Sequence, residues 1–118
     1  MEENPSVDKR IRSALIPFGY DVEKGVYRGE DNTYFVFGYN TIPIQPSDDT
    51  PEFERYLIWV RIVAPVTVKL TALLRQVKRA LEQAGFTYPQ STLVDDADAQ
   101  EYLLETEWAE QIGDEADD

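Results

Sequence analysis

The strict alternation of residues 53–63 constrains the fold more than any other part of the sequence. One set of alternating positions is apolar and consists of Tyr56, Ile58, Val60 and Ile62. The other set is mixed and consists of Arg55, Leu57, Trp59 and Arg61. Successive side chains of a β-strand point to opposite faces of the sheet. A period of two therefore predicts a long strand that buries one face in the core and leaves the other face outside it.

The mixed face of this strand has two interpretations. An aromatic side chain flanked by charges on an exposed sheet face is typical of a protein–protein contact, and so Arg55, Trp59 and Arg61 are candidate interface residues. The alternative is that Trp59 only covers the edge of the core. Both interpretations fit the sequence.

Three further segments favour extended structure. Residues 33–39 are rich in aromatic and β-branched side chains, which are common in strands. Residues 86–94 are also extended, and Pro89 places them at a sheet edge or in a loop. In residues 101–109, one set of alternating positions is Tyr102, Leu104, Thr106 and Trp108. The opposite set contains Glu101, Glu105 and Glu107. We interpret this segment as a final strand with one buried face. A helix is the alternative, because Glu and Leu are good helix formers.

Two segments have the spacing of amphipathic helices. In the first, Val7, Ile11, Ala14 and Leu15 share one face, and Pro17 and Gly19 end the helix. In the second, residues 68–84, the apolar stripe is Leu70, Leu73, Leu74, Val77, Leu81 and Ala84. Thr67 is the predicted N-cap and Gly85 the predicted stop. The bases Lys69, Arg75, Lys78 and Arg79 mostly occupy the other side, either as a solvated face or as a docking surface.

The order helix, several strands, long helix and strand predicts the fold class. Two amphipathic helices against one sheet bury both apolar stripes and one sheet face. We therefore predict an α+β fold, with a mostly antiparallel sheet and two helices packed on one face. The 118 residues suit a single domain, which we place at residues 1–111. We expect residues 112–118 to form an acidic, disordered tail.

The charge is unevenly distributed along the chain. The first 90 residues hold all 11 bases and 12 of the 23 acids, whereas residues 91–118 hold the other 11 acids and no base. This pattern predicts a near-neutral domain followed by an acidic segment. The segment is either a solvated tail or a group that docks on a basic surface. Because it would repel phosphates, we expect no direct nucleic-acid binding.

The composition removes the usual catalytic and metal-binding groups. Cysteine and histidine are absent, so thiolate nucleophiles, zinc–sulfur sites and Ser-His-Asp machinery are excluded. Asp95, Asp96 and Asp98 lack the central glycine and closing glutamate of a calcium loop. We expect no cofactor, no metal and no enzymatic activity. The N-terminus is acidic, and no apolar run approaches the roughly 20 residues that span a bilayer. We therefore expect a cytoplasmic protein without a membrane partner.

The order of elements resembles that of the tail-terminator, or tail-completion, proteins of long-tailed bacteriophages. The similarity runs from about Asp8 to Gln111. Its basis is the opening helix at residues 11–16, the aromatic strand at 34–37 and the long strand at 56–63. The amphipathic helix that ends in Ala-Gly-Phe at residues 84–86 and the closing strand at 102–107 complete it.

The resemblance implies a ring, commonly a hexamer, at the head-proximal end of the tail tube. Such a ring stops tube polymerisation and joins the tail to the head connector. The implied partners are further copies of this chain and the tail-tube or head-connector proteins. The implied location is the host cytoplasm during assembly, then the virion tail of a phage or prophage. A ring needs two different complementary patches per subunit. The basic helix face with the acidic C-terminal segment is one candidate pair, and the face that carries Trp59 is another candidate contact.

A small acidic inhibitor is the alternative function. A DNA mimic or an immunity-type protein would block a basic active site with the acids of residues 91–118. It would be a monomer or dimer with a salt-sensitive affinity for a basic enzyme. A ring-forming assembly protein would instead associate with itself or with tail-tube protein.

Overall fold

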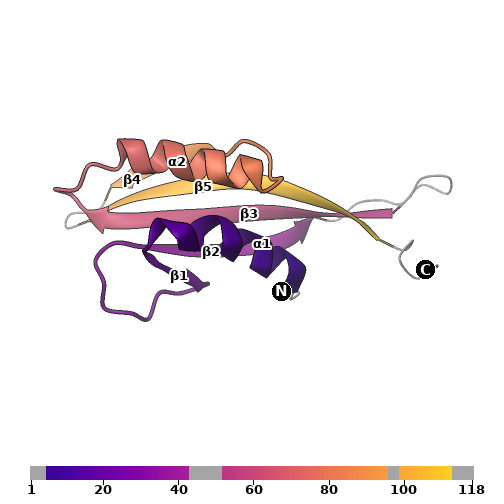
Figure 1. Cartoon of the computed structure of the whole chain (residues 1–118), viewed down its shortest axis with the longest axis horizontal. Helices are drawn as coiled ribbons and strands as arrows, with labels where there is room; N and C mark the ends of the chain where they lie inside the picture. Colours follow the sequence, from indigo (N-terminus) through magenta and orange to yellow (C-terminus); the bar gives the residue numbers. More distant parts are fainter. Residues whose placement is uncertain (1–4, 43–51, 96–98, 113–118) are drawn as a thin grey trace.

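The computed structural model describes residues 5–42, 52–95 and 99–112. Two helices lie over one face of a five-stranded sheet (Figure 1). The elements are α1 (Pro5–Leu15), the 3₁₀ turn η1 (Ile16–Phe18), β1 (Asp21–Lys24), β2 (Tyr34–Ile42), β3 (Glu52–Pro65), α2 (Thr71–Gln83), β4 (Gln90–Asp95) and β5 (Ala99–Ile112). The strand order is β1-β2-β3-β5-β4, and β1 and β2 are parallel whereas the other pairs are antiparallel. The predicted α+β class is therefore confirmed.

The central strand β3 has the alternation that the sequence predicts. Tyr56, Ile58, Val60 and Ile62 are buried on the face beneath the helices. β3 pairs with β5 over its whole length, from Glu52 opposite Ile112 to Pro65 opposite Ala99. Residues 101–109 are thus a strand, and the helical alternative is wrong. Only in a strand do the apolar residues of this segment share one side, which the core of the sheet buries.

The core lies between the helices and the sheet. α1 contributes Val7, Ile11 and Leu15, and α2 contributes Val77 and Leu81. The facing sheet residues include Phe35, Phe37, Tyr39, Tyr56, Ile58, Val60, Ile62 and Leu104. The Tyr39 and Tyr56 rings meet edge to face with centroids 5.8 Å apart, an arrangement that aromatic pairs favour.

Helix α1 and strand β1 are joined by a mostly buried polar cluster. The Lys24 ammonium lies 3.3 Å from a carboxylate oxygen of Asp8 and 4.7 Å from the centroid of the Tyr39 ring. The Tyr39 hydroxyl donates a hydrogen bond to the same Asp8 carboxylate. Because buried charges need partners, this cluster fixes the short edge strand β1 against the helix.

Helix α2 begins three residues later than predicted, and Thr67 does not cap it. Leu70 holds the N-cap position without a side-chain hydrogen bond. The reason is a turn in which the Val68 N–H donates to the Pro65 carbonyl at 3.0 Å. The Gln100 side chain donates to the carbonyls of Pro65 and Val68. These bonds to a distant strand hold residues 66–68 in a turn.

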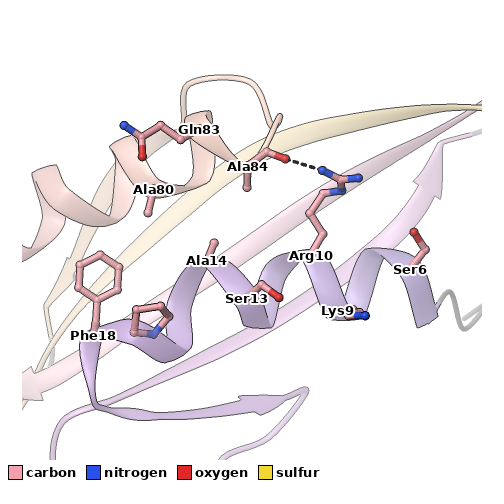
Figure 2. A pocket seen from close by; sticks show the side chains of 10 residues that line it. Ser6, Lys9, Arg10, Ser13, Ala14, Phe18, Ala80, Gln83 and Ala84 are labelled. Atoms are coloured by element: carbon pink, nitrogen blue, oxygen red, sulfur yellow. Dashed lines mark hydrogen bonds between the residues drawn. The ribbon is translucent and has the colours of Figure 1, made fainter.

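The other end of α2 is joined to α1 and to β5 by one side chain. The Arg10 guanidinium donates to the Ala84 carbonyl at 2.8 Å (Figure 2). It also lies 4.0 Å from the centroid of the Trp108 ring. Gly85, the predicted stop, has φ 105°, and a Cβ there would lie 2.8 Å from Trp108 Cζ3. A glycine is therefore required both by the left-handed conformation and by the close approach of the indole.

Some expectations concern residues outside the described part of the chain. Residues 113–118, most of the predicted acidic tail, lie outside it.

No helix in residues 5–42, 52–95 or 99–112 is long and apolar enough to span a membrane. In the same residues, no group of three or more metal-binding side chains gathers.

Two adjacent residues of β3 allow a test of the core assignment. Ile58 is 0% exposed on the helix-covered face, whereas Leu57 is 38% exposed on the opposite face. We expect Ile58→Ala to lower the free energy of unfolding by about 2–5 kcal/mol through lost burial and a cavity. Leu57→Ala is the matched control, with an expected loss of less than about 1 kcal/mol. Urea titration followed by circular dichroism measures both, and equal losses would contradict the assignment.

Candidate protein interface

The sheet face opposite the helices, called the open face below, is where most of the predicted site residues lie. The strand registers place the exposed or half-buried members of β2, β3 and β5 side by side on it. From the middle of the sheet these include Leu57, Trp59, Arg61, Leu103 and Glu105, whereas Val36 and Gly38 of β2 lie on the same face but are buried. Charged, aromatic and aliphatic side chains are therefore mixed on a surface that neither helix covers.

Six predicted residues come together on the open face. Arg55, Trp59 and Arg61 come from β3, and Glu101, Glu105 and Glu107 come from β5. Arg55 forms an ion pair with Glu107. Arg61 Nε lies 3.4 Å from an oxygen of Glu101. Both pairs are diagonal across the two strands, a spacing that long side chains can span.

These ion pairs are solvent-exposed, and so they contribute little to folding. The Arg55 and Glu107 side chains are 46% and 40% exposed. Exposed pairs of this kind are typically worth about 0–1 kcal/mol. A partner surface can therefore replace either bond at small cost.

Trp59 packs on the open face and not on the helix-side core. A Cβ at Gly38 would lie 2.1 Å from Trp59 Cζ2, so the indole lies directly against the backbone of β2. The Arg61 guanidinium lies 4.9 Å from the indole centroid, within the range of a cation–π contact. Trp59 is half-buried and is not among the side chains that pack against the core cluster. This geometry does not support the interpretation that Trp59 covers the edge of the core.

The four predicted basic residues lie on the other side of the molecule. Lys69 precedes α2, and Arg75, Lys78 and Arg79 lie on it. The Lys78 ammonium lies 5.8 Å from the Tyr88 ring centroid. No carboxylate of the described residues is within ion-pair distance of these four bases. Because Glu101, Glu105 and Glu107 are on the opposite face, the helix bases do not meet them within one chain.

Gly38 is a feature that the sequence reasoning missed. Its signal was present, because a glycine inside a β-rich run often marks a close approach of another group. The strand register places Trp59 opposite Gly38, so the group that approaches the glycine is the indole. The position of the Trp59 indole on the open face therefore depends on the absence of a side chain at Gly38.

A groove between α1 and α2 was also missed (Figure 2). Its volume is about 610 Å³. α1 contributes Lys9, Arg10, Ser13 and Ala14, η1 contributes Pro17 and Phe18, and α2 contributes Ala80, Gln83 and Ala84. Small side chains face each other across the groove, which leaves the space open. The signal in the sequence was the pair of alanines at positions 80 and 84, one helical turn apart.

One edge of the open face is closed by a tyrosine cluster. The Tyr27 ring stacks on Tyr34 with centroids 3.7 Å apart. Its hydroxyl donates to Asp21 at 2.8 Å and accepts from the Asp31 N–H at 2.9 Å. Desolvation, with the hydrogen bond to Asp21, raises the pKa of Tyr27 above its ordinary value. These contacts hold the turn that joins β1 to β2.

The fold is shared with solved structures of low sequence identity. No protein-family model and no curated protein matches this sequence. One solved structure is 10% identical, with a TM-score of 0.61 over 91% of this chain and 94% of that chain. A second comes from the virion of a native gene transfer agent (GTA) particle. It is 16% identical, with a TM-score of 0.60 over 90% of this chain and 92% of that chain. At these identities the likeness shows the fold.

A double-mutant cycle tests the packing of Trp59 on Gly38. We expect Gly38→Ala to lower the free energy of unfolding by about 1–3 kcal/mol, because the added methyl displaces the indole. In a Trp59→Ala background the same substitution meets no indole, and we expect it to be neutral or stabilising. Urea titrations of the four proteins measure the coupling. An equal cost of Gly38→Ala in both backgrounds would show that the indole does not lie against the glycine.

Proposed function

We propose that this chain is a structural assembly protein of a long-tailed phage or prophage. In this role it forms a ring that terminates the tail tube and joins it to the head connector. The observation that carries the proposal is the fold shared over nine-tenths of both chains with a component of a virion structure. The order of elements, which resembles that of tail-terminator proteins, supports the same role independently of that comparison.

The two faces of the sheet fit the needs of a ring subunit. Such a subunit must contact its neighbours through two different surfaces and must offer a further surface to the tube or the connector. The open face carries Trp59, a residue type that often anchors contacts. Around Trp59, the exposed pairs Arg55–Glu107 and Arg61–Glu101 keep the face hydrated until a partner covers it. The helix side carries bases that lack a carboxylate partner among the described residues.

The proposed partners are copies of this chain and the tail-tube or head-connector proteins. The chain would assemble in the host cytoplasm and remain in the virion tail. This role requires no catalysis and no direct contact with nucleic acid. It depends on surface complementarity alone, for which exposed aromatic and arginine side chains are suited.

The charge arrangement of the open face does not favour the acidic-inhibitor alternative. A protein that blocks a basic active site must present acids that its own bases do not neutralise. In this chain, Glu101 and Glu107 lie beside Arg61 and Arg55. These two acids of β5 therefore belong to a surface of mixed charge.

Deletion of the gene from the phage or prophage that carries it tests the proposed function. If the chain stops tube growth and joins the tail to the head, its loss should give unattached heads and tubes of abnormal, mostly greater, length. Negative-stain electron microscopy of induced lysates measures tube length and the fraction of joined particles. Wild-type protein supplied in trans is the control and should restore both. Normal, joined particles in the deletion strain would overturn the proposal.

The same assay tests the open face. We expect Trp59→Ala to restore fewer than a tenth of the joined particles, because it removes the aromatic anchor. Val66→Ala is the control, since Val66 is 57% exposed in the turn before α2 and away from the open face. It should restore joined particles fully. Full restoration by a folded Trp59→Ala protein would show that the open face is not the docking surface.

A further inference from the structure

The two central strands run beyond the rest of the sheet. The last residue of β2, Ile42, pairs with Arg55, and the first residue of β4, Gln90, pairs with Glu105. In the described sheet, residues 52–54 of β3 and 110–112 of β5 therefore pair only with each other; together with Arg55 and Ala109, at which this two-stranded ribbon begins, they are called the arm below. The three residues beyond Arg55 extend it by about 10 Å. Figure 1 shows the arm leaving the body of the molecule past the helices.

The arm is a two-stranded ribbon, and a ribbon of its kind needs support. An isolated two-stranded ribbon is marginally stable in water and is normally packed against a third element. In the described part of the chain, neither a further strand nor a helix covers the arm beyond Arg55 and Ala109. Among the residues that the structure describes, its outer backbone edges have no strand partner, and such edges can pair with another surface. A neighbouring molecule is the natural source of that surface.

The arm and the chain that follows it are acidic. Residues 107–118 hold six acids and no base, and β3 adds Glu52 and Glu54. The one base of the arm, Arg55, is already paired with Glu107. A surface that receives the arm should therefore be basic and free of carboxylates.

The groove between α1 and α2 has that character. Lys9 and Arg10 line it, and no carboxylate is among the described residues that do so. Next to the lining residues of α2 in sequence are the exposed base Arg79 and the exposed acid Glu82. The facing residues Ala14, Ala80 and Ala84 are small, so the backbone of an incoming strand can approach closely (Figure 2).

The course of β5 directs the arm away from the groove of its own chain. β5 passes the groove at Trp108, whose ring lies against the Arg10 guanidinium. The following residues continue outward, still paired with β3, to Ile112. A groove on another molecule therefore meets the arm more directly than its own groove does.

We infer that the acidic arm of one copy docks in the groove between α1 and α2 of the next copy. The contact joins two different surfaces of the same chain, so its repetition builds a head-to-tail assembly that can close into a ring. The inference rests on the ring-forming role proposed above and names the two surfaces that make the ring. The open face then remains available to the tube or the connector.

Engineered cysteines test this contact, because the chain has none of its own. Ser13→Cys places a thiol in the groove, and Ala109→Cys places one on the arm; both positions are exposed. We mix the two single variants at about millimolar concentration with a mild oxidant. A disulfide requires Cα atoms within about 7 Å, so it reports direct contact. We expect a disulfide-linked dimer between the variants, and a ladder of linked multimers from the double variant.

Matched controls separate docking from random collision. Asn40→Cys is an exposed position on the open face, and we expect its yield with Ser13→Cys to be at least fivefold lower. Lys9→Glu in the groove, or 1 M salt, should lower the Ser13–Ala109 yield by a similar factor, because the contact is electrostatic. Gln83→Cys, on the α2 side of the groove, is a second position if the Ser13 variant does not fold. Circular dichroism confirms that each variant is folded.

Three outcomes overturn the inference. They are the absence of a groove–arm disulfide at both groove positions, a disulfide confined within single chains, and a stronger link from the groove to Asn40→Cys. The gene deletion described above keeps this result separate from the proposed function. Assembly defects without the groove–arm disulfide leave the proposed function standing and overturn only the contact. A specific disulfide with normal, joined particles keeps the contact and overturns the tail role.

Discussion

The pairing of β3 with β5 is the constraint on which the rest of this structure depends. The two strands share one register over their whole length, so every alternate residue of both is committed to the same face. Ile58, Val60 and Leu104 must then be covered from one side, and both amphipathic helices are required there. The opposite face keeps arginine, glutamate and tryptophan in contact with solvent. A shift of one residue between the strands would exchange the two faces.

The Arg10 contacts show how a single side chain can place two helices relative to this sheet. Its guanidinium lies on Trp108 of β5 and donates to the Ala84 carbonyl at the end of α2. A carbonyl at a helix C-terminus lacks a partner within the helix, and a positive charge there is favourable. The same residue also lines the groove between the helices. One interaction therefore fixes both the packing of the layer and the shape of the surface that we assign to the neighbouring subunit.

The fold sorts the charges of a chain that is strongly acidic as a whole. The helix side keeps most of the bases, and the last strand places its acids beside Arg55 and Arg61 or carries the chain away from the body. The result is a molecule with unlike surfaces, which suits repeated association of one chain with copies of itself. Exposed ion pairs of this kind stabilise the fold little.

The sequence by itself determined the fold class, both apolar helix stripes and the two faces of β3, because these follow from side-chain periods of 3.6 and 2 along a continuous segment. It also predicted that Arg55, Trp59 and Arg61 share one face of their strand and that Glu101, Glu105 and Glu107 share one face of theirs. Only the tertiary structure decided that Trp59 lies on Gly38, that Gln100 delays the start of α2, and that Arg10 joins α2 to Trp108. Each of these contacts joins residues at least 20 positions apart. Strand register and helix packing bring these residues together, and neither can be read from the residue period within one segment.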